Sequence, residues 1–106
     1  MMAFESAILH AEKALQLSPR DTFRYSFHMS KAMSLLFLQR FDEAIESATA
    51  AIIDRKNFLI SHYILIAALE LKGELVEARA AVGELKALSP EVTMRSIRES
   101  VRFFQN

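Results

Sequence analysis

The stretch FDEAIESATAA, residues 41–51, decides the fold because its pattern occurs twice more in the chain. FESAI at residues 4–8 and LVEAR at residues 75–79 share its order of a large apolar residue, two intervening residues and an alanine. Small or apolar residues follow each alanine at four and seven positions, which places them on one face of a helix. The sequence therefore predicts three related helices.

A repeat period follows from the spacing of these helices. The alanines of the three copies, Ala7, Ala44 and Ala78, recur at a period of about 34 residues, and the first interval is longer because of a short insertion near residues 19–21. More apolar helices lie between them at the same period. The predicted helices span residues 3–17, 22–39, 42–54, 58–72, 75–88 and 91–103. Two helix types that alternate at this period predict an all-α fold, an α-solenoid of antiparallel helix pairs.

The composition excludes several classes of protein. The 106 residues include 13 Lys and Arg, 13 Asp and Glu, and no cysteine. A chain without cysteine forms no disulfide and no thiolate zinc site, and a net charge of zero argues against nucleic-acid binding. The longest apolar run, residues 63–69, is far shorter than the ~20 residues that span a bilayer. These features predict a cytoplasmic protein without membrane insertion.

The repeats resemble the tetratricopeptide repeat family. Residues 59–92 carry Leu65, Gly73, Ala78 and Pro90 where that repeat has its consensus leucine, inter-helix turn, alanine and closing proline. His28 and His62 depart from the pattern at the consensus tryptophan, and Ile66 fills a glycine site. The resemblance implies about two and a half repeats plus a C-terminal cap helix: a half repeat at 1–21, repeats at 22–58 and 59–90, and the cap at 91–106.

The first helix has no partner within its own half repeat. Ile8 and Leu15 are therefore expected on an exposed apolar edge. Such an edge is a poor end for a solenoid, because terminal repeats need a polar cap. The chain is predicted to be a fragment of a longer protein. A homodimer is one arrangement that would cover the edge.

A narrower resemblance concerns the ends of two helices. ALQLSPRD at residues 14–21 and the segment 78–91 are similar to the C-terminal repeats of bacterial adenylate/guanylate cyclase-type regulators. The resemblance implies a signalling protein with its catalytic domain upstream. None of the cyclase's metal-binding or nucleotide-binding residues maps onto this chain, so we expect a non-catalytic module.

Candidate chemistry is sparse, and no catalytic residue, metal site or cofactor is predicted. His28 and His62 occupy equivalent places in successive repeats, too far apart to share a metal, and both are interpreted as packing residues. Acidic residues at helix starts complement the helix dipole. Arg95, Arg98 and Arg102 share one face of the last helix, which is interpreted as the solvated side of the cap.

The candidate binding site is the concave groove of the solenoid. The residues expected to face it are apolar and lie at helical spacing on the two first-type helices: Met29, Met33, Phe37, Tyr63, Ala67 and Leu71. A methionine-rich apolar groove suits an apolar or amphipathic protein segment. One alternative for the groove stays open: these side chains are buried against one another. One alternative for the function also stays open: the chain is a scaffold or self-association module of another regulator or enzyme complex.

Overall fold

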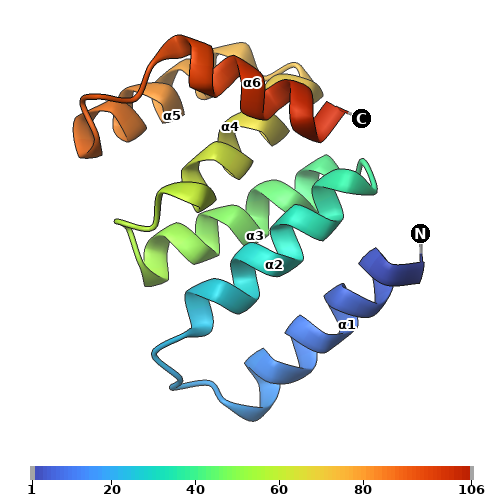
Figure 1. Ribbon diagram of the computed structural model, residues 1–106. Helices are drawn as coiled ribbons and strands as arrows, with labels where there is room; N and C mark the ends of the chain where they lie inside the picture. The colour runs from blue at the N-terminus through green and yellow to red at the C-terminus, as the bar shows by residue number, and fades with distance from the viewer. Residues whose placement is uncertain (1, 106) are drawn as a thin grey trace.

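The computed structural model describes residues 2–105 and shows an all-helical chain (Figure 1). The helices of this range are α1 Met2–Leu17, α2 Arg24–Phe37, α3 Phe41–Asp54, α4 Leu59–Lys72, α5 Leu75–Leu88 and α6 Met94–Gln105. No strand occurs among the described residues. The predicted all-α class and all six predicted helices are therefore confirmed. Within this range no helix is both long and apolar enough to cross a bilayer.

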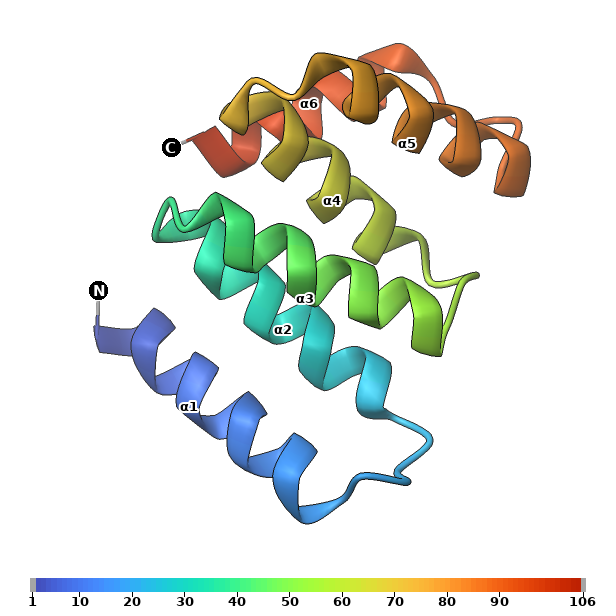
Figure 2. The ribbon, with the colours of Figure 1, turned by 180° about the vertical axis from the view of Figure 1, so that it is seen from behind.

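The first five helices follow one another in space in chain order, and α6 turns back onto α4 and α2. Each of the first four packs on the next, and in addition α4 packs on α2, and α6 packs on α4 and on α2 (Figure 1). The layer of α2, α4 and α6 is thus continuous. Among the described residues, α1, α3 and α5 do not pack on one another. Figure 2 shows α3 and α5 from behind, with α6 on the far side of α5.

The period of the sequence recurs in the helix bounds. Helix α5, Leu75–Leu88, repeats the bounds of α3, Phe41–Asp54, with the same offset at its start and at its end. The helix before each of them is followed by a left-handed residue, Gln39 with φ 62° or Gly73 with φ 96°. After both, the amide of the next residue donates to a carbonyl near the end of the helix, as in a Schellman cap. The prediction that Gly73 ends its helix is confirmed.

Two buried clusters hold the layers together. The first joins α1, α2, α3 and α4 and reaches α6 through Phe104, and the second joins α4, α5 and α6. Their buried members are the residues Ile8, Ala32, Leu35, Leu36, Ala44, Ala48, Ile64, Ala67, Ala68 and Phe104 in the first and Ile66, Leu69, Ala78, Ala81, Leu85 and Ile97 in the second. The repeated alanines Ala44 and Ala78 are buried, as the sequence pattern predicts.

The expectation for the edge of α1 is wrong in one residue. Ile8 is only 7% exposed because α2 covers it, and Leu15 is partly buried. Among the α1 side chains whose burial the structure describes, the exposed large apolar ones are Leu9 and Leu17. Helical periodicity alone predicts an apolar stripe along α1. The direction from which α2 approaches decides which side of that stripe is covered.

Helix starts differ slightly from the sequence prediction. The second helix begins at Arg24 rather than residue 22, because the Asp21 carboxylate accepts a hydrogen bond (2.8 Å) from the amide of Phe23 and forms a turn. The last helix begins at Met94 rather than residue 91. Thr93 Oγ1 there accepts a hydrogen bond from the amide of Ser96, which satisfies one free donor of the first turn.

Candidate functional site

The six residues predicted for the groove lie on α2 and α4, within the continuous layer. Their burial differs. Ala67 is completely buried and offers no surface to a partner. The side chains that remain partly exposed are Met29, Met33, Phe37 and Leu71, packed against the first cluster, and Tyr63, packed against the second.

Helix α6 lies over part of this layer. It packs mainly on α4 and to a lesser extent on α2, with Ile97 and Phe104 buried and Val101 partly buried. The Tyr63 and Ser96 hydroxyl oxygens are 3.3 Å apart, so the middle of α4 is tied to the first turns of α6. The sequence predicts α6 as a cap but gives no signal that it lies on the groove side.

The opposite side of α6 faces solvent. Arg95, Arg98 and Arg102 are exposed, as predicted for the cap helix, and Glu99 lies among them. Apolar residues at positions 97, 101 and 104 have the i, i+4, i+7 spacing of one helix face. The layer of α2 and α4 therefore already holds one amphipathic helix with a basic outer face.

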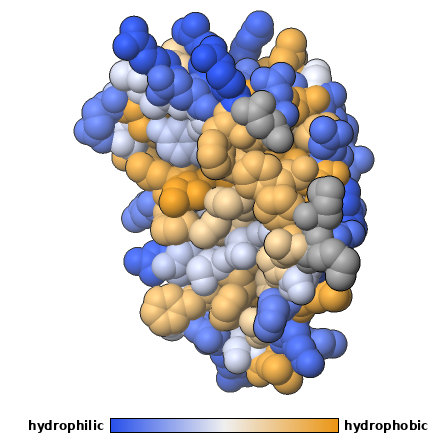
Figure 3. Space-filling view, turned by 45° about the vertical axis from the view of Figure 1, so that its right-hand side comes forward, coloured by the Kyte–Doolittle hydropathy of each residue, from blue (hydrophilic) through white to orange (hydrophobic). Residues whose placement is uncertain are grey.

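A cluster of phenylalanines joins α1, α2 and α6 at one end of the layer. The ring of Phe37 is 5.0 Å from that of Phe4 in a stacked arrangement, and 5.8 and 5.4 Å from those of Phe103 and Phe104. Phe103 remains 63% exposed. Figure 3 shows apolar residues gathered on this side of the molecule with hydrophilic residues around them. Phe37 is thus the centre of an aromatic contact rather than a free groove residue.

The three histidines occupy separate environments. His10 is exposed, whereas His62 is 1% exposed and its Nε2 lies 2.8 Å from the carbonyl oxygen of Lys56. His28 Nε2 lies 3.6 Å from the Asp54 carboxylate, and burial lowers the pKa of His28 below its usual 6.5, while Asp54 opposes the shift. Within residues 2–105 no group of three or more His, Asp or Glu side chains is arranged to hold a metal ion.

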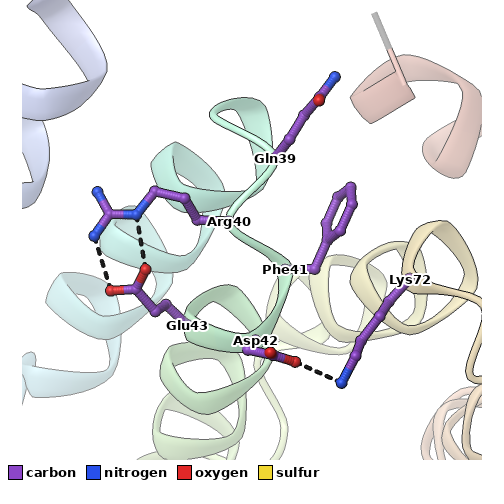
Figure 4. A pocket seen from close by; sticks show the side chains of 6 residues that line it. All are labelled: Gln39, Arg40, Phe41, Asp42, Glu43 and Lys72. Atoms are coloured by element: carbon purple, nitrogen blue, oxygen red, sulfur yellow. Dashed lines mark hydrogen bonds and ion pairs between the residues drawn. The ribbon is translucent and has the colours of Figure 1, made fainter.

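A hollow of about 310 Å³ at the start of α3 carries charged residues (Figure 4). Arg40 donates two hydrogen bonds, 2.7 and 2.8 Å, to the Glu43 carboxylate, and Lys72 Nζ lies 2.5 Å from Asp42. These bonds lower the pKa of Glu43 and raise the pKa of Lys72. Each cation is matched by an adjacent carboxylate in an open hollow, an arrangement typical of a surface ion pair rather than of acid–base catalysis.

Family models and curated proteins were both compared with the chain. No family model matches the chain, and no curated protein matches it. The tetratricopeptide resemblance therefore depends on the residues quoted above and on their positions in the structure.

Proposed function

We propose that this chain is a tetratricopeptide-type solenoid that serves as a non-catalytic protein-interaction module. The recurrence of the helix bounds at the repeat period supports this assignment, and so do the burial of Ala44 and Ala78 and the left-handed turn at Gly73. The partner is an amphipathic helix that docks on the concave layer of α2 and α4.

The observation that carries this proposal is the position of α6. This helix has one apolar face and packs it on α4, so it is an example of the kind of segment that suits the layer. Because α6 covers α2 less than α4, the surface around Met29 and Met33 is the part of the layer with most room for a second helix. Methionine side chains are flexible and adapt to partners of different shape.

The parent protein is a further part of the proposal. The resemblance to cyclase-type regulators implies a cytoplasmic bacterial signalling protein in which this module follows a catalytic domain. The rival is a scaffold or self-association module in another regulator or enzyme complex. The sequence of the full-length gene product distinguishes the two, because only the first has a nucleotide cyclase domain upstream.

The test uses a fluorescein-labelled synthetic peptide with the sequence of residues 91–106, which carries the apolar face of α6. We expect saturable binding by fluorescence anisotropy. Met29→Glu with Met33→Glu should weaken it at least tenfold, about 1.4 kcal/mol, because two carboxylates would have to be desolvated under the peptide. Far-UV circular dichroism of the double variant should match that of the parent.

The matched control places two carboxylates on the outer layer. Ala80→Glu with Ala87→Glu alters exposed residues of α5 and should leave peptide binding unchanged. Unfolding of the Met29/Met33 variant would show that these side chains are core, and undiminished binding would show that the peptide docks elsewhere. Either result contradicts the proposal.

A further inference from the structure

The outer face of α6 concentrates positive charge on the surface of the molecule. Arg95, Arg98 and Arg102 are exposed there, and together with Glu99 they line a hollow of about 550 Å³. Every residue that lines this hollow is charged, and all but one of them are arginines. We call this surface the arginine face.

The arginines of this face are not matched by carboxylates of the chain. At the start of α3, by contrast, Arg40 pairs with Glu43. Among the described residues, no ion pair involves an arginine of the arginine face. Glu99 is four residues from Arg95 and three from Arg102, spacings at which side chains of one helix can pair, yet it pairs with neither. The face therefore presents three unpaired guanidinium groups to solvent.

The polarity of the helix adds to this charge at one end. Helix α6 begins at Met94 and has no acidic residue in its first turn, where Arg95 lies. A cation in the first turn opposes the helix dipole, which favours anions at that end. The first turns of α3 and α5 carry acidic residues instead, namely Asp42, Glu43 and Glu77. An anion bound at the start of the arginine face would thus stabilise both the helix end and Arg95.

The spacing of the arginines restricts the ligand. Arg95 and Arg102 are seven residues apart, which is two helical turns or about 10 Å along the axis. A single phosphate or carboxylate is too small to serve the whole face, whereas a chain with several carboxylates can place one against each arginine. The planar guanidinium group binds a carboxylate through two parallel hydrogen bonds, so arginine suits such a partner well.

Two other anionic partners fit the face less well. An amphipathic helix binds a bilayer by inserting its apolar side, but α6 has already buried Ile97 and Phe104 in the fold, and only Phe103 remains exposed beside the arginines. A nucleic-acid-binding domain is typically basic as a whole, whereas this chain has 13 basic and 13 acidic residues. An acidic protein segment requires neither an inserted apolar side nor a basic domain.

We propose that the arginine face binds an acidic segment of a partner protein, with one carboxylate against each arginine. The face lies on the side of α6 that points away from α4, so this binding does not depend on the function proposed for the layer of α2 and α4. Glu99 is the one group of the face that repels such a segment. It therefore limits the affinity, and its removal should have the opposite effect to the removal of an arginine.

The test is fluorescence anisotropy of the full chain with a fluorescein-labelled peptide of ten glutamates, in 100 mM NaCl to screen charges beyond about 10 Å. We expect saturable binding. Arg95→Gln with Arg98→Gln should weaken it at least tenfold, because two charge-assisted contacts are lost, and Glu99→Gln should strengthen it. The matched control Arg20→Gln with Arg79→Gln removes the same charge from exposed arginines elsewhere and should leave binding within twofold.

Competition distinguishes the other anions. At constant ionic strength, neither inorganic phosphate nor vesicles that contain phosphatidylserine should displace the glutamate peptide, and a labelled peptide of ten glutamines should not bind. Displacement by either competitor would overturn the proposal, and so would a parent that does not bind the glutamate peptide. Equal losses in the Arg95/Arg98 variant and in the Arg20/Arg79 control would also overturn it, because net charge alone would then explain the binding. Far-UV circular dichroism of every variant should match the parent, and Glu99→Gln tests the face without removing an arginine.

Discussion

The pairs α2–α3 and α4–α5 are built on one pattern but are packed differently. All four helices have 14 residues, and α3 and α5 share one buried alanine position, Ala44 and Ala78. The backbone of α3 lies close to those of α2 and α4, whereas among the described helices the backbone of α5 lies close to that of α4 alone. Ala48 is completely buried, and its counterpart Val82 is only partly so. Equivalent residues thus differ in burial because their helices differ in neighbours.

The cause is the position of α6. In a regular stack α6 would follow α5 as α4 follows α3, but it packs on α4 and α2 instead. A hollow of about 390 Å³ remains beside α4 and α5, lined by Glu70, Leu75, Ala78, Arg79, Val82 and Met94. Helix α6 has one apolar face and arginines on the other, so it can bury only one side. The arginine-bearing face of α6 is therefore left to solvent.

The largest difference in stability between the two pairs is expected when arginine replaces their shared alanine. Ala44→Arg should destabilise the chain by more than about 3 kcal/mol, since Ala44 is completely buried and the guanidinium has no route to water. Ala78→Arg should be milder, about 1–2 kcal/mol, because Ala78 borders the open hollow and a long side chain can extend through it. Urea unfolding followed by circular dichroism measures both.

A paired small-to-small change controls for backbone effects. Ala44→Ser and Ala78→Ser should lower stability by similar amounts. If only the arginine variants differ greatly in stability, the difference comes from the space and solvent access around each alanine. Equal losses for the two arginine variants would show that the hollow beside α5 is closed in solution.

Much of the fold is predictable from the sequence because alanine spacing and helix phase are local properties. The runs that contain Ala44 and Ala78, the turn at Gly73 and the six helices all follow from residues a few positions apart. Ile8 shows where local reasoning ends. The apolar stripe of α1 is correctly placed, yet its burial depends on how α2 approaches, and the sequence does not determine that direction.

The candidate site is less predictable for the same reason. Helical periodicity predicts one shared face for Phe37 of α2 and for Tyr63 and Ala67 of α4. The exposure of these side chains depends on α6, which is distant in sequence. The amphipathic pattern of residues 97, 101 and 104 could have indicated that α6 needs an apolar surface to pack on. It could not indicate which surface, because the α4–α5 hollow and the layer of α2 and α4 are both lined mainly by apolar residues.

A smaller effect is expected at the two turns. Gln39 carries the steric penalty of a left-handed backbone that Gly73 avoids, so Gln39→Gly should stabilise the first pair by about 0.5–1 kcal/mol. Gly73→Gln should destabilise the second by about 1 kcal/mol through backbone strain alone, because an added Cβ there meets nothing within 4 Å. Thermal melts should shift in opposite directions. Shifts of the same sign would show that the two turns are not equivalent.

The smallest expected effect concerns His28, in the first pair. Burial lowers the pKa of His28 in the folded chain, so the unfolded chain binds the proton more tightly. The stabilisation from neutral His28 is therefore fully present above pH 6.5 and is lost as the pH falls through the lower folded pKa. Asp54 limits the loss, since its carboxylate favours the charged ring. Melts at pH 7.5 and 5.5 should show a smaller decrease for His28→Gln than for the parent, and Asp54→Asn should enlarge the parent's decrease. An unchanged decrease in both variants would mean that His28 does not contribute to the acid sensitivity of the fold.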